Sequence, residues 1–276
     1  MLDSGSRCLS RNDPTFKDCT PMSGRIGMSS PPQTSSIRIL PEVIGRSRLE
    51  ARALIAGFHG IGATGYWTVK FLIQELKARR VCYIDSEFAP AVSSTVKNEI
   101  STPYELYGIG DLLLLKAEVP PLRENETRFF RELSQWIMGS GIQEVTLIGG
   151  LDESLRSDDS KYRVVLTDAM KTGEHGRGLE AEPILEEGRM IVGPVAVMLN
   201  AFQMRGYPAA AILSYSNTER IDPRAAAAAV EFVAKRYALE VNIEPLIKGA
   251  EELERELVGL AQKEKDKGGP SGAIYS

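Results

Sequence analysis

The feature that most constrains the fold is a short apolar segment that runs into a glycine-rich turn and then a helix, at residues 53–76. Ala53–Ala56 is a short apolar run of the kind found in buried strands. Four glycines follow it: Gly57, Gly60, Gly62 and Gly65. Large apolar residues then recur at helical spacing: Trp67, Phe71, Leu72 and Leu76. A buried strand, a tight turn and an amphipathic helix in this order predict the start of an α/β domain.

The same turn matches part of a nucleotide-binding fingerprint. Gly60–Gly65 reads G-x-G-x-x-G, and the next apolar segment, Arg80–Asp85, ends in an acidic residue. In dinucleotide-binding proteins such glycines let the backbone approach a pyrophosphate, while the acid binds the ribose hydroxyls. A tight turn from strand to helix needs glycine in any case, and bulky residues crowd this loop: Phe58, His59 and Ile61. We therefore favour a structural turn and keep ligand binding as the alternative.

The rest of the chain alternates short apolar strands with helices. An edge strand and a turn fit Ile37–Leu49, whereas Phe88–Tyr107 is mixed and polar, with Pro90 and Pro103. Further strands are predicted at Leu112–Glu118, Val145–Ile148, Tyr162–Thr167 and Ala209–Tyr215. Helices are predicted at Glu124–Met138, at Val195–Arg205 and after the Asp222-Pro223 start signal. This alternation indicates an α/β fold with a largely parallel sheet.

Composition divides the chain into four parts. Residues 1–36 are rich in Ser, Pro, Gly and Asp without hydrophobic periodicity, which predicts a disordered N-terminal extension. Residues 37–243 are the predicted α/β core domain, residues 244–265 a C-terminal helix, and residues 266–276 a flexible tail. The helix carries a heptad stripe that fits either packing on the parent domain or an oligomer contact: Leu246, Ala250, Leu253, Leu257 and Leu260.

Charge, cysteine and histidine content argue against several classes of function. A net charge of −4 gives no sign of nucleic-acid binding, and no apolar run is long enough to cross a bilayer. Cys8, Cys19 and Cys82 share no CxxC spacing, so we expect neither a disulfide framework nor a zinc site, which suits the cytoplasm. With only His59 and His175, a histidine metal site or a Ser-His-Asp triad is hard to assemble. We expect no cofactor, no metal and no catalytic residue.

The C-terminus carries the most specific binding signal. Ile274, Tyr275 and Ser276 place an apolar side chain, an aromatic ring and a carboxylate together at the end of the sequence, behind the Gly268–Gly272 linker. A groove with a lysine could capture all three, because carboxylate capture is a recurrent mode of peptide recognition. As a flexible chain, residues 266–276 would reach about 18 Å. A tripeptide pattern this loose also arises by chance, and its position at the terminus is what favours a binding role.

Several segments together resemble the proteasome-assembly-chaperone (PAC2-like) family, in particular its archaeal homologues. The resemblance covers about residues 38–241. Its motifs are Gly57–Gly65, Ile148–Gly150, Gly193–Leu199, Gly206–Ala209 and Ile221–Ala227.

The resemblance implies a three-layer α/β/α sandwich related to nucleoside phosphorylases but without their catalytic apparatus. It also implies a homo-oligomer or a pair of chains. Archaeal homologues with a hydrophobic-Tyr-X (HbYX) tail resemble ATP-independent proteasome activators whose tail docks on the α-ring of the 20S proteasome. In this sequence the matching tail residues are Ile274, Tyr275 and Ser276. The long segment 1–36 departs from the family pattern.

Two hypotheses therefore remain open. In the first, the chain is an interaction protein that binds the 20S α-ring through its tail, as an assembly chaperone homologue or an activator. In the second, it is a nucleotide- or small-molecule-binding α/β protein, or an enzyme, that uses the Gly57–Gly65 loop and Asp85.

Overall fold

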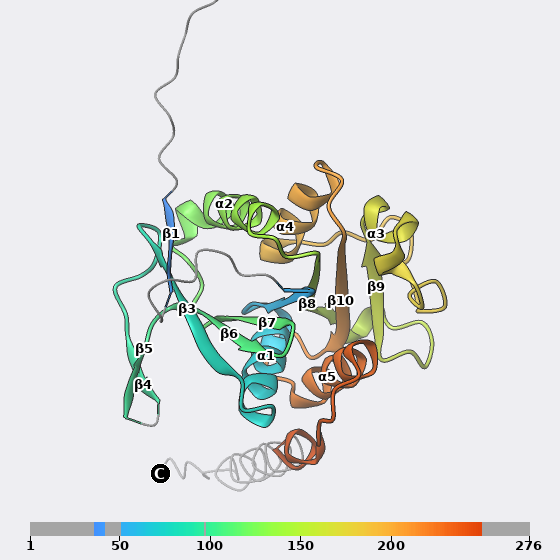
Figure 1. The fold of residues 1–276 in the computed structure, drawn as a ribbon. Helices are drawn as coiled ribbons and strands as arrows, with labels where there is room; N and C mark the ends of the chain where they lie inside the picture. The colour runs from blue at the N-terminus through green and yellow to red at the C-terminus, as the bar shows by residue number, and fades with distance from the viewer. Residues whose placement is uncertain (1–35, 42–50, 97, 250–276) are drawn as a thin grey trace, which may run out of the picture. The chain divides into compact units, whose positions relative to one another are not determined.

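The computed structural model describes residues 36–41, 51–96 and 98–249. The predicted N-terminal extension up to residue 35, most of the predicted C-terminal helix and the whole predicted tail lie outside the described residues. The described part of the chain is organised around one eight-stranded sheet, with the strand order β1-β3-β6-β7-β2-β8-β10-β9 (Figure 1).

The centre of this sheet is parallel and its flanks are antiparallel. The parallel strands are β7 (Leu112–Ala117), β2 (Ala53–Gly57), β8 (Glu144–Asp152) and β10 (Ala209–Ser216). The flanking strands, each antiparallel to its neighbours, are β1 (Ile37–Pro41), β3 (Arg79–Ser86), β6 (Tyr104–Ile109) and β9 (Tyr162–Leu166). Since β3 runs in the same direction as the four central strands, the expected α/β fold with a largely parallel sheet is confirmed.

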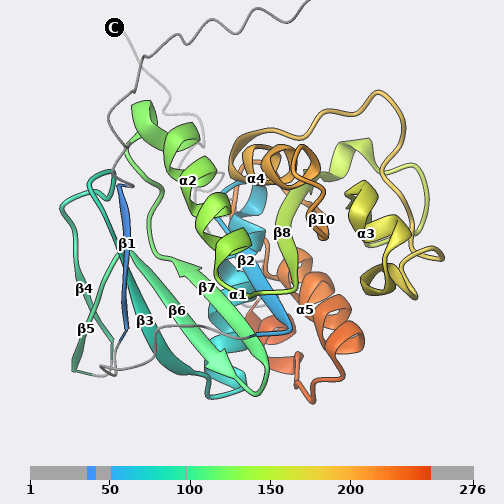
Figure 2. The same ribbon diagram turned by 45° about the horizontal axis from the view of Figure 1, so that its top comes forward.

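Helices cover both faces of the sheet, as the predicted three-layer sandwich requires (Figure 2). On one face α1 (Thr64–Glu75) packs against α5 (Pro223–Tyr237). On the other face α2 (Glu126–Gly139) packs against α4 (Gly193–Gln203). The short helix α3 (Asp168–Thr172) contacts β10, and 3-10 turns precede α1 and α2 at Ile61–Ala63 and Arg123–Asn125.

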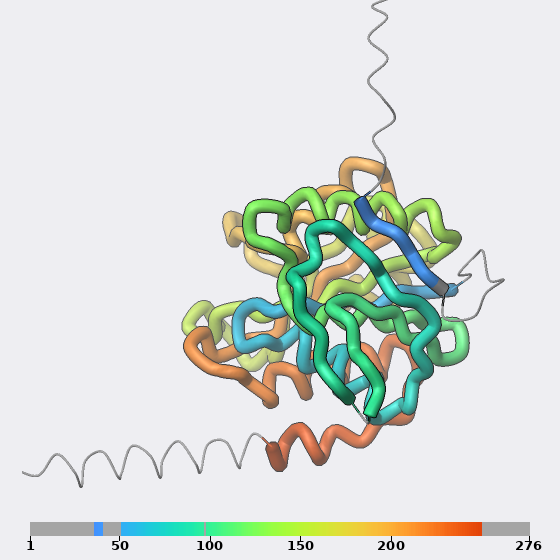
Figure 3. Tube along the Cα trace, turned by 90° about the vertical axis from the view of Figure 1, so that its left-hand side faces the viewer, coloured from blue at the N-terminus to red at the C-terminus, as the bar shows by residue number. Residues whose placement is uncertain are grey.

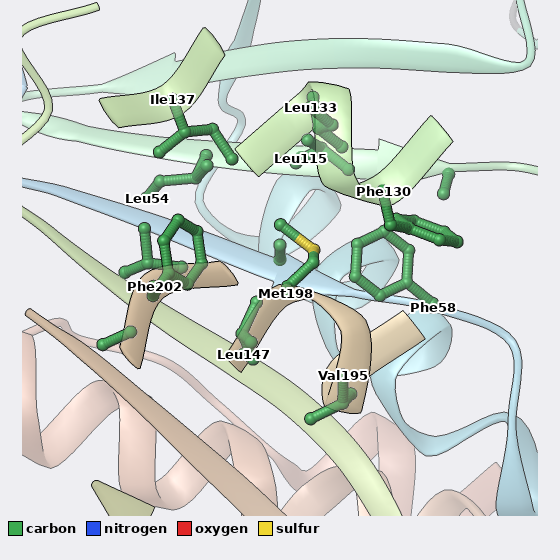
Figure 4. Packing of buried hydrophobic residues seen from close by; sticks show 14 of the residues in the cluster. Leu54, Phe58, Leu115, Phe130, Leu133, Ile137, Leu147, Val195, Met198 and Phe202 are labelled. Carbon is green, nitrogen blue, oxygen red and sulfur yellow. The ribbon is translucent and has the colours of Figure 1, made fainter. Parts of the chain in front are cut away.

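Two apolar cores lie between these layers. The core under α2 and α4 includes the fully buried residues Leu54, Leu133, Ile137, Leu147 and Phe202 (Figure 4). Burying a side chain of this size contributes about 1.5–3 kcal/mol. The core under α1 and α5 contains alanines that let the two helices approach closely, and Thr68 Oγ1 lies 3.4 Å from the Ala226 carbonyl oxygen.

The start of α5 follows the sequence signal. Asp222 is the N-cap, and its carboxylate accepts hydrogen bonds from the amides of Arg224 (3.0 Å) and Ala225 (3.1 Å). Pro223 occupies the first turn, where its missing N–H costs nothing. The predicted helix start at Asp222-Pro223 is therefore confirmed.

The mixed and polar segment Phe88–Tyr107 contains two strands and the start of a third, β6, which ends at Ile109. A hairpin of β4 (Ser94–Val96) and β5 (Glu99–Ser101) forms a separate two-stranded sheet, and β6 joins the main sheet. No strand was predicted at β6, because Glu105 is fully buried there in an ion pair with Lys116, which hides the apolar pattern of a buried strand.

Two further regions complete the described fold. Figure 3 views the sheet from the side of β1, which pairs with β3 from Ile37 opposite Ser86 to Pro41 opposite Cys82. Residues 244–249 are helical, and Leu246 is buried in the core under α1 and α5. The rest of the predicted heptad stripe lies outside the described residues.

Candidate functional site

The glycine loop lies where ligands bind in many α/β sheets. From β2 the chain moves to one side of the sheet, to β3, β6 and β7, and after β7 it crosses to β8 on the other side of β2. The neighbouring carboxyl ends of β2 and β8 are therefore the switch point of the sheet, where an open crevice commonly forms. At these ends stand the Gly57–Gly65 loop and Gly149-Gly150.

Three of the four loop glycines are required by close packing. A Cβ atom on Gly57 would come within 3.0 Å of the Gly65 backbone, and one on Gly65 would lie 2.7 Å from the Phe58 amide nitrogen. Gly62 has φ +60°, and a Cβ there would clash with Ser216. Only Gly60 has nothing within 4 Å.

The amino end of α1 is occupied by the protein itself. The Tyr66 amide donates to the Phe58 carbonyl oxygen at 3.2 Å, and the Thr64 hydroxyl donates to the Ile61 carbonyl oxygen at 3.1 Å. The Gly62 carbonyl oxygen accepts from the Asp222 amide at 3.0 Å. A pyrophosphate needs free amides and open space at this position. The Tyr66 amide is already bonded, and the close packing of Gly57 and Gly65 leaves no open space between them.

Asp85, the residue that would bind a ribose, is not next to the glycine loop. It lies on β3, and both β6 and β7 separate β3 from β2. Three strand spacings amount to about 14 Å. The Asp85 carboxylate instead pairs with Arg38 of β1 at 2.6 Å. The two parts of the nucleotide-binding alternative are thus not brought together.

Beside the loop, on the α4 side of the sheet, there is a cavity of about 340 Å³ that we call the α4 hollow. It lies at the carboxyl ends of β2, β8 and β10. Its rim carries Glu126, Met190 and Val192. Its lining is largely apolar and includes Phe58, Ile61, Ile148, Leu151, Val195 and Leu213. Phe58 and Val195 are seen near α4 in Figure 4.

His59 borders both the hollow and the loop. Its ring stacks on Tyr66 with 4.1 Å between ring centroids, and its Nδ1 atom is buried without a hydrogen-bond partner. Burial lowers the pKa of His59 below its usual value, against the opposing effect of Glu118. The imidazole is therefore neutral at pH 7. In the described part of the chain, no serine, threonine or cysteine is hydrogen-bonded to it, so it lacks the nucleophile that a general base would activate.

A buried ionic network adjoins the loop, and the sequence pattern did not reveal it. Lys116 Nζ lies 2.8 Å from Glu105 and 3.3 Å from Glu118. The Tyr66 hydroxyl donates to Glu118 at 2.7 Å, and Lys70 Nζ donates to that hydroxyl at 2.6 Å. Burial would raise the pKa of Glu105, but hydrogen bonds from Lys116 and its neighbours outweigh it and hold this pKa below its usual value. The only hint in the sequence was a lysine inside the apolar run LLLLKA.

The remaining predictions concern the C-terminal tail, metal sites and membrane spans. Ile274, Tyr275 and Ser276 lie outside the described residues, so their binding role stays a prediction. Across residues 36–41, 51–96 and 98–249, no cluster of three or more His, Cys, Asp or Glu side chains is arranged to hold a metal ion. None of the helices in these ranges combines the length and the apolar character needed to span a bilayer.

Comparison with known proteins agrees with this architecture. An uncharacterized protein of Methanocaldococcus jannaschii is 26% identical over 231 residues, which are 79% of this chain and 86% of that protein. The structure of Pyrococcus furiosus PbaA, an archaeal homologue of proteasome-assembly chaperone, is similar with a TM-score of 0.67 and 25% identity, covering 84% of this chain and 99% of PbaA.

Pyrococcus furiosus PbaB, an archaeal proteasome activator, shares the fold, with a TM-score of 0.67 and 22% identity over 83% of this chain and 100% of PbaB. Most of the chain, residues 54–261, matches the sequence model of one family, PAC2. The chain, which also has the fold of a proteasome-assembly-chaperone homologue, belongs to the PAC2 family.

Proposed function

We propose that this chain is a proteasome-binding protein, an assembly chaperone homologue or ATP-independent activator that docks its C-terminal tail on the α-ring of the 20S proteasome. The observation that carries the proposal is the terminal Ile274-Tyr275-Ser276 sequence on a chain of the PAC2 family. Support comes from two proteins of the same fold, PbaA and PbaB, which are described as an assembly-chaperone homologue and a proteasome activator.

Each tail residue has a distinct role in this proposal. Ile274 fills an apolar pocket, Tyr275 stacks and hydrogen-bonds, and the carboxylate of Ser276 pairs with a lysine of the α-ring. One tail alone binds weakly, because a flexible peptide loses conformational entropy when it docks. An oligomer that presents several tails gains affinity when their spacing allows simultaneous docking.

The glycine loop is a fold element in this account, and the chain is not an enzyme. Gly57, Gly62 and Gly65 allow β2 to turn tightly into α1, and their close contacts supply the reason for their presence. The separation of Asp85 from the loop and the unpaired, neutral His59 weigh against nucleotide chemistry at this position. A thermal-shift screen with NAD, NADP, nucleosides and phosphate tests this alternative, since a ligand that binds the folded state raises the melting temperature. We expect no shift.

The proposal is tested by capture of 20S core particle from a matched source on the immobilised full chain. Deletion of residues 274–276 removes the apolar anchor and the aromatic ring and leaves the terminal carboxylate on Ala273, and we expect capture to fall to background. Ser276→Ala is the matched control, because it keeps a terminal carboxylate and should retain capture. Undiminished capture by the deleted chain would show that the tail is not the docking element.

A further inference from the structure

The α4 hollow has the size and the lining of a small-molecule site. Its volume of about 340 Å³ lies at the lower end of the range of ligand pockets, which are mostly apolar with a few polar groups that orient the ligand. It lies at the switch point of the sheet, where ligands of α/β proteins commonly bind. Its rim carries two apolar side chains that solvent reaches, since Met190 is 86% exposed and Val192 is 75% exposed. An apolar ligand would shield both.

Glu126 determines which charge a ligand of the hollow can carry. Among the described residues that line the hollow there is no lysine or arginine, so a phosphate or carboxylate ligand would find no cationic partner there. The Glu126 side chain is half-buried, and it forms no hydrogen bond or ion pair with any residue that the structure describes. A free carboxylate beside an apolar cavity favours a ligand with an ammonium group.

A second polar group on the lining also lacks a partner. His59 Nδ1 is buried, and it has no hydrogen-bond partner among residues 36–41, 51–96 and 98–249. The imidazole is neutral because burial lowers the pKa of His59, and with its proton on Nε2 the Nδ1 atom is an acceptor. Buried polar atoms without partners are rare in folded proteins and call for an explanation. In this tautomer both unpartnered groups, Glu126 and His59, accept hydrogen bonds, and both select a ligand that donates them.

The amino ends of two helices act against a cation here, but more weakly than Glu126 attracts it. No side chain caps α4, and its first turn holds no acidic residue, so this end carries about half a positive charge. Glu126 itself lies in the first turn of α2, which favours a carboxylate there without occupying its oxygen atoms. The effect of a helix dipole falls off within one turn, whereas an ammonium group in contact with Glu126 forms a charge-assisted hydrogen bond with a whole charge.

We propose that the α4 hollow binds a small apolar amine, with its aromatic or aliphatic body against Phe58, Leu151 and Val195 and its ammonium group at Glu126. The ligand is bound and not converted, because in the described part of the chain no nucleophile is hydrogen-bonded to His59. The site lies on the core domain and does not involve the tail. The inference therefore goes beyond the proposed function and does not depend on it.

A matched set of four probes tests the ligand class on the full chain by titration in saturation-transfer NMR. Phenethylamine carries the ring and the ammonium group, phenethyl alcohol keeps the ring without the charge, hydrocinnamate reverses the charge, and ethylamine lacks the ring. We expect phenethylamine to bind saturably with a Kd below about 1 mM and phenethyl alcohol to bind about tenfold more weakly. Hydrocinnamate and ethylamine should show no saturable binding.

Two variants separate the charged end of the site from its apolar end. Glu126→Gln keeps the shape of the side chain and removes its charge, so phenethylamine should bind about tenfold more weakly while phenethyl alcohol is unaffected. Gly149→Ala places a methyl group 3.0 Å from Leu213 Cδ2 and 3.4 Å from Val195 Cγ2, between two side chains of the lining, and should weaken both probes alike. Glu124→Gln is the control: Glu124 is exposed, does not line the hollow, and its substitution should change neither affinity.

Three results would overturn the proposal: no saturable binding of phenethylamine, hydrocinnamate or ethylamine binding as tightly as phenethylamine, or equal losses for the amine and the alcohol in Glu126→Gln. Circular dichroism confirms that each variant is folded. Tyr275→Ala should bind phenethylamine as the native chain does, and Glu126→Gln should retain capture of 20S core particle. Failure of this site is therefore distinguishable from failure of tail docking.

Discussion

The two sides of the carboxyl end of the sheet use glycine in opposite ways. On the α1 side, Gly57 and Gly65 are in backbone contact, and no side chain fits at either position. On the α4 side, Gly60 and Gly193 have nothing within 4 Å, and a cavity of about 340 Å³ opens beside them. The same residue type closes one side by packing and borders open space on the other.

This difference explains why the G-x-G-x-x-G pattern is a poor guide to ligand binding. A phosphate loop needs glycines beside open space and free amides. In Gly60–Gly65, only Gly60 borders open space, whereas Gly62 and Gly65 are packed against Ser216 and Ile148. The glycine pattern therefore reflects the close packing of α1 against the sheet and not a phosphate site.

The largest expected effect is on the α1 side, where glycines are packed against backbone; we call it the closed side. Gly65→Ala places a methyl group 2.7 Å from the Phe58 amide nitrogen, and backbone cannot move away as a flexible side chain can. We expect a loss of about 4 kcal/mol in the free energy of unfolding, measured with denaturant. Gly60→Ala is the matched control and should cost less than about 1 kcal/mol. Equal costs at the two positions would remove the distinction between the two sides.

A somewhat smaller effect is expected from the ionic network that holds α1 and β7 together. Lys116→Met takes from the fully buried Glu105 the nearer of its two cations, leaving Arg80 at 3.5 Å, and should cost about 3 kcal/mol. The control is Lys161→Met, which breaks an exposed pair with Glu231 and should cost less than about 1 kcal/mol. A loss at Lys116 as small as that at Lys161 would show that the buried pair does not stabilise the closed side.

The same pair predicts a dependence on pH. The pKa of Glu105 is held below its usual value of 4.5, so the folded state binds this proton less readily than the unfolded state. The resulting stability is present above pH 4.5 and is lost as the pH falls through the folded-state pKa. As the pH falls below 4.5, the free energy of unfolding should therefore decrease less in Lys116→Met than in the native chain. Parallel titration curves would contradict this.

The smallest effect is expected at His59, on the border between the two sides. Burial lowers the pKa of His59 below 6.5, so its contribution to stability is present above pH 6.5 and declines as the pH falls. His59→Phe keeps an aromatic ring against Tyr66 and removes this decline. Because His59 is only half-buried, the difference between pH 7 and pH 5 should be below about 1 kcal/mol. A variant that loses as much stability as the native chain over this range would contradict the assignment.

Much of the fold follows from local sequence pattern, because short apolar runs and helix caps act locally. The β2 strand, the helix after it and the start of α5 at Asp222-Pro223 were predictable for this reason. The strand β6 was not, because Glu105 is neutralised by Lys116, which pairs with it from the neighbouring strand β7. The position of Asp85 depends on strand order: β6 and β7 lie between its strand, β3, and the strand β2 that leads into the glycine loop.

In the candidate site, too, local features were predictable from the sequence and features that depend on distant contacts were not. The glycine loop is visible in the sequence, but whether its glycines are packed or open depends on backbone contacts between distant segments, such as Gly65 with Ile148. The α4 hollow forms between β2, β8, β10 and the segment before α4, and no local pattern marks it. The terminal Ile274-Tyr275-Ser276 is visible only as sequence, and its role is a proposal.

Substitutions at Tyr275 show whether the tail is the docking element, when the affinity of the full chain for 20S core particle is measured. Tyr275→Phe removes only the hydroxyl, and Tyr275→Ala removes the ring. We expect Tyr275→Phe to weaken capture modestly and Tyr275→Ala to abolish it, with the mass of the protein in solution unchanged in both. Native affinity in Tyr275→Ala would contradict the claim.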